Sequence, residues 1–147
     1  MLSKIIQFSF LAILLFSSKQ AYAQAQVELK KIQLTTPENT YDSKDQTFQL
    51  EQGTKREIVI SEGGAKITIE MKITRMKSKI SNHKDLGIKL QYNYLCVFGW
   101  EKRKGKSERF FWPGEETSFD EKMEFSFDRK KLNPSQIKIN FNAQIKM

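Results

Sequence analysis

Two residue types that carry much of protein chemistry are almost missing from this chain, which has one cysteine and one histidine in 147 residues. The single cysteine, Cys96, excludes an intramolecular disulfide. Cys96 lies among apolar residues, so we expect a small buried hydrophobe and not a reactive nucleophile. The single histidine, His83, lies in a basic segment, and zinc sites need several converging ligands. We therefore expect no metal site and no cofactor.

Motifs for catalysis are also lacking. A Ser-His-Asp triad would have to use His83, and no Gly-x-Ser-x-Gly motif accompanies it. Acidic residues gather between Glu115 and Glu124, where carboxylates can bind calcium or serve a glycosidase. Their alternation with lysine indicates a solvated face instead. We expect a protein that is not an enzyme, with a hydrolase using Glu116 and Asp120 as the less favoured alternative.

Only one long apolar run is present, Ile5 to Phe16, and it follows the positive charge of Lys4. Ala21-Tyr22-Ala23 then places small residues where a signal peptidase reads them. The run is shorter than the roughly 20 residues of a spanning helix, which argues against a membrane anchor. Residues 1–23 are therefore predicted to be a signal peptide, cleaved after Ala23 or alternatively after Ala25. Residues 24–147 would form one secreted or periplasmic domain.

Positive charge is in excess, with a formal net charge of +8. Loss of Lys4 and Lys19 with the signal peptide would leave +6. Outside the cytoplasm, such a balance indicates a partner that is an acidic protein, an anionic envelope polymer or lipid head groups. Nucleic acid is not expected as a partner. Most aromatic residues occupy the strand positions predicted to face the core, whereas aromatic rings that stack on bases must be exposed.

Helical spacing is absent, whereas alternation of apolar and polar residues is widespread. The longest example runs from Leu86 to Trp100, with an apolar or aromatic residue at every even position. The segments 65–73, 119–127 and 137–145 alternate in the same way. About eight such strands predict an all-β fold, a single antiparallel β-sandwich. An eight-stranded β-barrel is the alternative.

Turn residues predict how these strands connect. Gly63-Gly64 suits a two-residue hairpin with Ile60 opposite Ile67 and Ile58 opposite Ile69. A turn centred on Gly105 would place Trp100 opposite Phe110, and a Pro113-Gly114 turn would pair Trp112 with Glu115. A change of phase after Lys30-Lys31 indicates a β-bulge, and the segment 35–44 reads as a loop.

One surface stands out as a candidate binding site. Leu95, Val97 and Phe111 are predicted to lie opposite the core face of the central hairpin, where a loop could cover them or a partner could bind. The neighbouring basic residues are Lys102, Arg103, Lys104 and Lys106. We expect a non-catalytic binding domain that uses these seven residues. A carrier of small apolar ligands, with a barrel cavity lined by Tyr92, Tyr94 and Phe125, is the second hypothesis.

Overall fold

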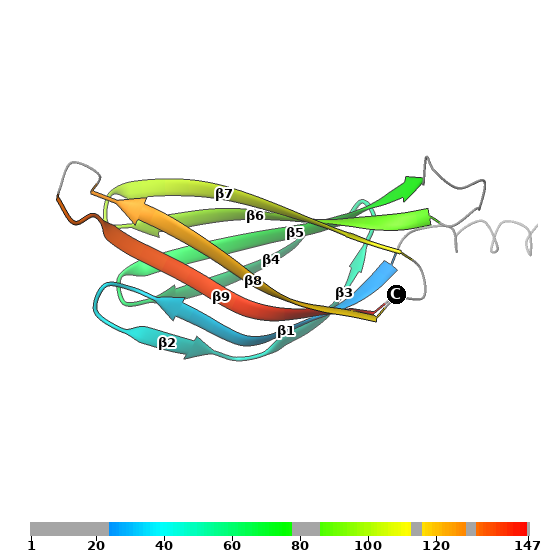
Figure 1. The fold of residues 1–147 in the computed structure, drawn as a ribbon, viewed down its shortest axis with the longest axis horizontal. Helices are drawn as coiled ribbons and strands as arrows, with labels where there is room; N and C mark the ends of the chain where they lie inside the picture. The colour runs from blue at the N-terminus through cyan, green and yellow to red at the C-terminus, as the bar shows by residue number, and fades with distance from the viewer. Residues whose placement is uncertain (1–23, 78–85, 113–115, 129–131, 147) are drawn as a thin grey trace, which may run out of the picture.

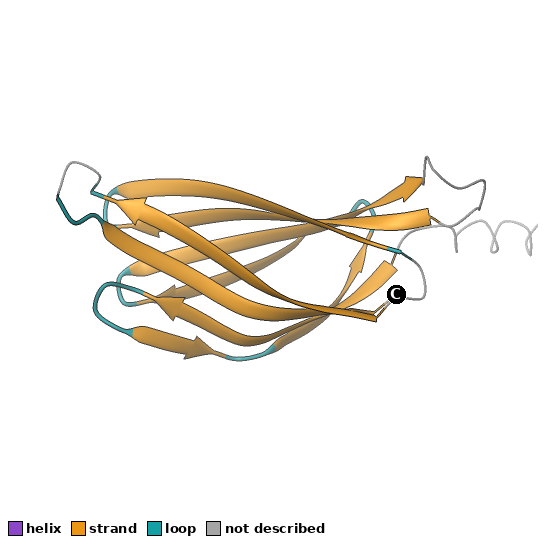
Figure 2. Ribbon diagram, viewed as in Figure 1, coloured by secondary structure: helices purple, strands orange, loops and turns teal. Residues whose placement is uncertain are grey.

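The computed structural model describes residues 24–77, 86–112, 116–128 and 132–146. Within these ranges every regular element is a β-strand, and the strands run along the length of an elongated molecule (Figures 1 and 2). Two antiparallel sheets pack face to face, which confirms the predicted β-sandwich. Over the described residues the sheets do not close into a barrel. The same ranges contain no helix with the length and apolar character needed to cross a bilayer.

The first sheet has five strands. Its order is β2 (Thr40–Ser43), β1 (Gln24–Thr35), β9 (Ser135–Lys146) and β8 (Glu116–Phe127), with β3 (Gln46–Glu51) also paired to β1. The second sheet is a meander with the order β4 (Arg56–Glu62), β5 (Ala65–Lys77), β6 (Leu86–Phe98) and β7 (Glu101–Phe111). Nine strands are thus present in the described chain. The extra strand, β2, lies in the segment that was predicted to be a loop.

The core lies between the sheets and follows the alternation in the sequence. On β9 the residues at odd positions from Ile137 to Ile145 are buried, and their even neighbours are not. On β6 the even positions from Ile88 to Cys96 are buried, and Cys96 is fully buried. Burial raises the pKa of the Cys96 thiol to about 12, so the thiolate nucleophile is suppressed.

Two local predictions are confirmed in detail. Gly63 and Gly64 have φ of 58° and 77°, and the hairpin pairs Ile60 with Ile67 and Ile58 with Ile69. Glycine adopts positive φ without a steric penalty, so the turn chemistry fixes the register. On β1, the register with β9 shifts between Lys30 and Gln33, with Lys31 at a φ of 52°. This is the expected bulge.

The predicted turn at Gly105 is wrong. The hairpin between β6 and β7 turns at Gly99-Trp100, and Phe98 pairs with Glu101. Gly99 has a φ of 61°, which suits the first central position of a type II′ turn. Gly105 lies within β7, where a Cβ atom would come within 2.9 Å of the Met123 sulfur. Gly105 therefore permits close packing between the sheets and makes no turn.

The predicted pairing of the segments on either side of Pro113-Gly114 is also wrong. β8 pairs with β9, and its register places Phe125 opposite Ile137. β7 belongs to the other sheet, so the connection crosses between the layers of the sandwich. Residues 113–115 themselves lie outside the described chain. Within the basic segment 75–85, residues 75–77 belong to β5, and residues 78–85, including His83, are not described.

Candidate binding face

The outer surface of the β4–β7 sheet holds five of the seven residues that the sequence singled out. Leu95 and Val97 lie on the outer side of β6, and both are partly exposed. The register of β6 and β7 places Lys102 opposite Val97, Lys104 opposite Leu95 and Lys106 opposite Asn93. Lys66 of β5 lies on the other side of Val97. We call this surface the basic face; it consists of Lys66, Leu95, Val97, Lys102, Lys104 and Lys106.

Phe111 does not belong to this surface. It pairs with Ile88, is 3 % exposed and stacks on Phe119 at 5.7 Å between ring centroids. Its neighbour Phe110 points outward instead and is 57 % exposed. The error follows from the misplaced turn, because a change of register by one residue reverses which side chains face the core. Phe110 therefore takes the outward position that was predicted for Phe111.

Arg103 does not belong to this surface either. Its guanidinium carbon lies 5.3 Å from the ring centroid of Phe127, and its Nε donates to the Ser126 carbonyl at 3.1 Å. The same guanidinium forms an ion pair with Glu101. Ser126 and Phe127 belong to β8, so Arg103 joins the edges of the two sheets. Arg103 is a structural residue at the seam of the sandwich.

The four lysines of the basic face share one property. Among the described residues, none of Lys66, Lys102, Lys104 and Lys106 forms an ion pair or hydrogen bond through its ammonium group. All four side chains are exposed. An unpaired surface ammonium retains its full attraction for a partner's negative charge, because no internal carboxylate has to be displaced.

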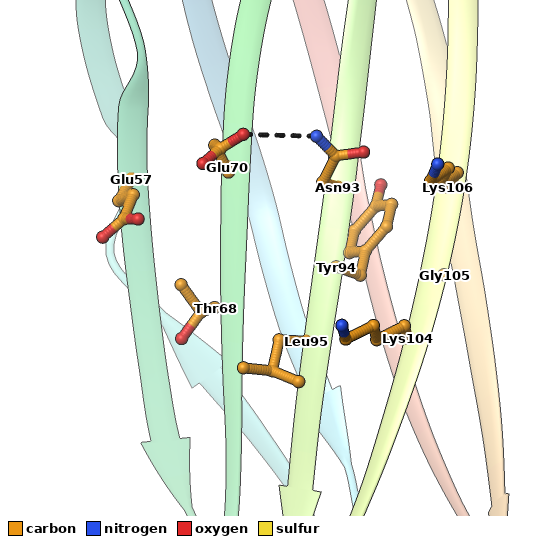
Figure 3. A pocket seen from close by; sticks show the side chains of 9 residues that line it. All are labelled: Glu57, Thr68, Glu70, Asn93, Tyr94, Leu95, Lys104, Gly105 and Lys106. Carbon is orange, nitrogen blue, oxygen red and sulfur yellow. Dashed lines mark hydrogen bonds between the residues drawn. The ribbon is translucent and has the colours of Figure 1, made fainter.

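A hollow of about 370 Å³ lies in the same surface (Figure 3). Leu95 gives it an apolar wall, and Lys104 and Lys106 border it from β7. The opposite wall of the hollow comes from β4 and β5 and carries the carboxylates of Glu57 and Glu70. The volume is within the range of about 300–1,000 Å³ that small-molecule sites occupy.

Glu70 is the better compensated of these two acids. Its carboxylate accepts hydrogen bonds from Lys55 Nζ at 3.1 Å and from Asn93 Nδ2 at 3.2 Å. These bonds, that of Lys55 first, lower the pKa of Glu70 below its ordinary value. With Glu70 paired, the positive charge of Lys104 and Lys106 dominates the β7 side of the hollow.

The opposite outer surface, that of β1, β8 and β9, has a different organisation. Lys30 and Lys146 contact the two oxygens of Glu28 at 3.2 Å and 3.6 Å. Lys122 and Lys138 share one oxygen of Glu124 at 2.8 Å and 3.7 Å. Every position on this surface in β8 and β9 is polar. We call it the paired face and define it by the residues of these ion pairs, Glu28, Lys30, Lys122, Glu124, Lys138 and Lys146.

Three large aromatic side chains of the second sheet are exposed, and the sequence patterns did not separate them from core residues. Trp100 in the β6–β7 turn is fully exposed, at 103 %. Trp112 is 41 % exposed, and its ring lies over Gly87, where an added Cβ would approach within 2.9 Å. With Phe110 they lie along β7 or at its ends. A turn placed at Gly99-Trp100 would have predicted this exposure, because it puts Trp100 in the turn and Phe110 on the outward side of β7.

The acidic residues that the sequence offered for metal binding or catalysis are placed as follows where the structure describes them. No group of three or more histidine, cysteine, aspartate or glutamate side chains comes together within the described residues in a way that could hold a metal ion. Asp120 lies on the outer surface of β8, where it accepts a hydrogen bond from Asn142 Nδ2 at 3.1 Å. The side chain of Glu116 and the whole of His83 lie outside the described part.

The side chains proposed to line a barrel cavity pack against one another. The rings of Tyr94 and Phe125 are 6.5 Å apart, and Tyr92 lies 5.9 Å from Phe141. All four residues are buried. The carrier hypothesis required a closed barrel with these residues around a ligand, and they fill the space between two sheets instead.

Comparison of the chain with protein families, with curated proteins and with solved structures found no match.

Proposed function

We propose that this protein is a non-catalytic binding domain that acts outside the cytoplasm and contacts an acidic protein or an anionic envelope component through the basic face. The observation that carries the proposal is the set of four unpaired lysines around the partly exposed Leu95 and Val97. Apolar contact area beside unpaired cations favours an anionic partner with some apolar surface.

The proposed location depends on the signal peptide. Cleavage after Ala23 would keep every described residue of β1 in the mature chain. Cleavage after Ala25 would remove a buried residue that pairs with Leu50. These two facts favour Ala23. N-terminal sequencing of the protein recovered from its own cells should give Gln24, and recovery of an intact Met1 would contradict the proposal.

The binding proposal is tested by comparing two triple variants with the same net charge. K102Q/K104Q/K106Q removes three cations from the basic face, and K122Q/K138Q/K146Q removes three from the paired face. Each variant is mixed with the envelope fraction of its own cells, and the bound protein is eluted along a salt gradient. The first variant should bind about 10-fold more weakly at low salt, since each lost ion pair is worth a few tenths to 1 kcal/mol.

The control variant should bind as the natural protein does. Equal weakening of both variants would show that net charge alone governs retention, and the basic face would then have no special role. A third variant, L95T/V97T, separates the apolar contribution, because threonine keeps the β-branched shape of valine while adding a hydroxyl. It should weaken the binding that remains at high salt.

A further inference from the structure

The outward residues of β7 form a single line. Alternate residues of a strand point to the same side, so Lys102, Lys104, Lys106, Glu108 and Phe110 share one surface. Trp100 precedes this line in the turn, and Trp112 follows it over Gly87. At about 3.4 Å per residue, neighbouring lysines are about 7 Å apart and the line from Lys102 to Phe110 is about 27 Å long. We call these seven residues the β7 row.

The β7 row places aromatic rings at both ends of a positively charged centre. Trp100 borders a second hollow, of about 410 Å³, together with Phe98 and Phe127. At the other end, the indole of Trp112 packs on the glycine surface beside the exposed Phe110. The Trp112 ring, held against the sheet and 41 % exposed, is a preformed stacking platform, because little side-chain entropy remains to be lost on binding. Trp100 is fully exposed and offers its whole ring to a partner.

We propose that the β7 row binds a linear acidic polysaccharide, a polymer of sugar rings that carry carboxylate or phosphate groups, laid along the strand. This inference rests on the proposed function and names the partner's chemical class. Lysines in a line match negative groups repeated along a chain. The aromatic ends match the apolar faces of sugar rings.

Three acids lie near the row: Glu70 is paired with Lys55, Glu57 lies on β4 at the far wall of the hollow, and Glu108 belongs to the row itself. Glu108 is the one acid among its residues, and its carboxylate accepts a hydrogen bond from Gln91 Nε2 at 2.8 Å. Glu108 separates the three lysines from Phe110 and Trp112. We therefore expect the lysines to contact the anionic groups of the polysaccharide, and Phe110 and Trp112 to contact its sugar rings. The hollow beside Lys104 and Lys106 gives room for a sugar ring next to the lysines.

A bilayer surface fits the row less well. Interfacial anchoring distributes aromatic and basic side chains over a plane. Here three unpaired lysines and three exposed aromatic residues follow one edge strand, and the sheet beside them is hollowed. A polymer lies along such a line, whereas a bilayer has to contact the whole face.

The test uses three probes with the purified protein: oligomers of polygalacturonic acid, polyphosphate, and vesicles containing anionic phosphatidylglycerol. Affinity for polygalacturonate should rise with oligomer length until the oligomer spans the row. K102Q/K104Q/K106Q should weaken binding of both soluble polymers about 10-fold. W100A and F110A should each lower the affinity for polygalacturonate about 3- to 10-fold, which is the contribution expected of one aromatic contact. The affinity for polyphosphate should not change in these two variants. V59T, at an exposed position on β4, is the matched control and should change neither.

Two results would overturn the inference while leaving the proposed function intact. One is that W100A and F110A lower the affinity for both polymers equally, or lower neither affinity, since sugar rings would then play no part in binding. The other is binding to vesicles alone. If the lysine variant instead binds every probe as well as the natural protein does, the inference and the proposed function both fail. All of the substituted side chains are exposed, and thermal unfolding checks that each variant folds.

Discussion

The basic face and the paired face each include four lysines, and these lysines differ in their contacts. On the paired face, Lys30, Lys122, Lys138 and Lys146 all contact a carboxylate. On the basic face the four lysines have no such contact among the described residues, and partly exposed apolar residues lie between them. Internal pairing lowers the positive charge that a surface presents, so the unpaired lysines of the basic face are more available to an anionic partner than those of the paired face.

The inward and outward residues of β7 make different contacts. Its inward residues Arg103 and Arg109 cross to β8: Arg109 pairs with the buried Glu121 at 3.0 Å and lies over Phe119. These contacts join the edge strands of the two sheets, and Arg103 also donates to one backbone carbonyl of β8, that of Ser126. Outward lysines and inward arginines alternate along one strand, with binding proposed for the first and stability for the second.

The largest expected effect separates the two sides of β7 at adjacent residues. Phe111→Ala should lower the free energy of unfolding by about 3–5 kcal/mol, because it empties a buried site against Phe119. Phe110→Ala should change it by less than about 1 kcal/mol. Urea denaturation measures both. Similar losses for the two variants would mean that the assigned register of β6 and β7 is wrong.

A smaller effect distinguishes Arg103 from its lysine neighbours. Arg103→Ala should cost about 1–2 kcal/mol of stability, through the lost stacking on Phe127 and the lost bond to the Ser126 carbonyl. Retention on the envelope fraction should not change once the protein is folded. Lys102→Ala should leave the free energy of unfolding nearly unchanged and weaken retention on the envelope fraction. Urea denaturation and the salt-gradient elution, applied to both variants, test this exchange of roles.

The smallest effect concerns pH and the paired face. Hydrogen bonds and charge from Lys30 and Lys146 lower the pKa of Glu28, and Lys122 and Lys138 do the same for Glu124. A carboxyl whose pKa is lower in the folded state stabilises the fold above its ordinary pKa, and this contribution is lost as the pH falls through the folded value. Stability should therefore decline slightly below about pH 4.5. In E28Q/E124Q that decline should be smaller, and an unchanged acid profile would contradict the pairing.

The sequence was sufficient where alternation and turn chemistry agreed. Ile58 to Ile69 around Gly63-Gly64 and the odd positions of Ile137 to Ile145 were placed correctly, because one face of each strand is wholly apolar and only one register buries it. The buried position of Cys96 followed from the same pattern on β6.

The sequence failed on β7 for a physical reason. Glu101, Arg103, Ser107 and Arg109 occupy its inward positions, so the strand has no apolar face by which to recognise its register. An arginine at the edge of a sandwich covers aromatic rings with its planar guanidinium and still reaches solvent or a carboxylate, which alternation patterns read as exposed. That error moved Phe111 outward and Arg103 into the binding group.

The most direct test of the basic face is a lysine-labelling footprint, recorded on the protein free and bound to the envelope fraction of its own cells. An amine-reactive reagent modifies exposed lysines, and mass spectrometry reports the extent at each one. Binding should protect Lys66, Lys102, Lys104 and Lys106 and leave Lys30, Lys122 and Lys138 as reactive as before. Protection of the second group, or of both groups equally, would contradict it.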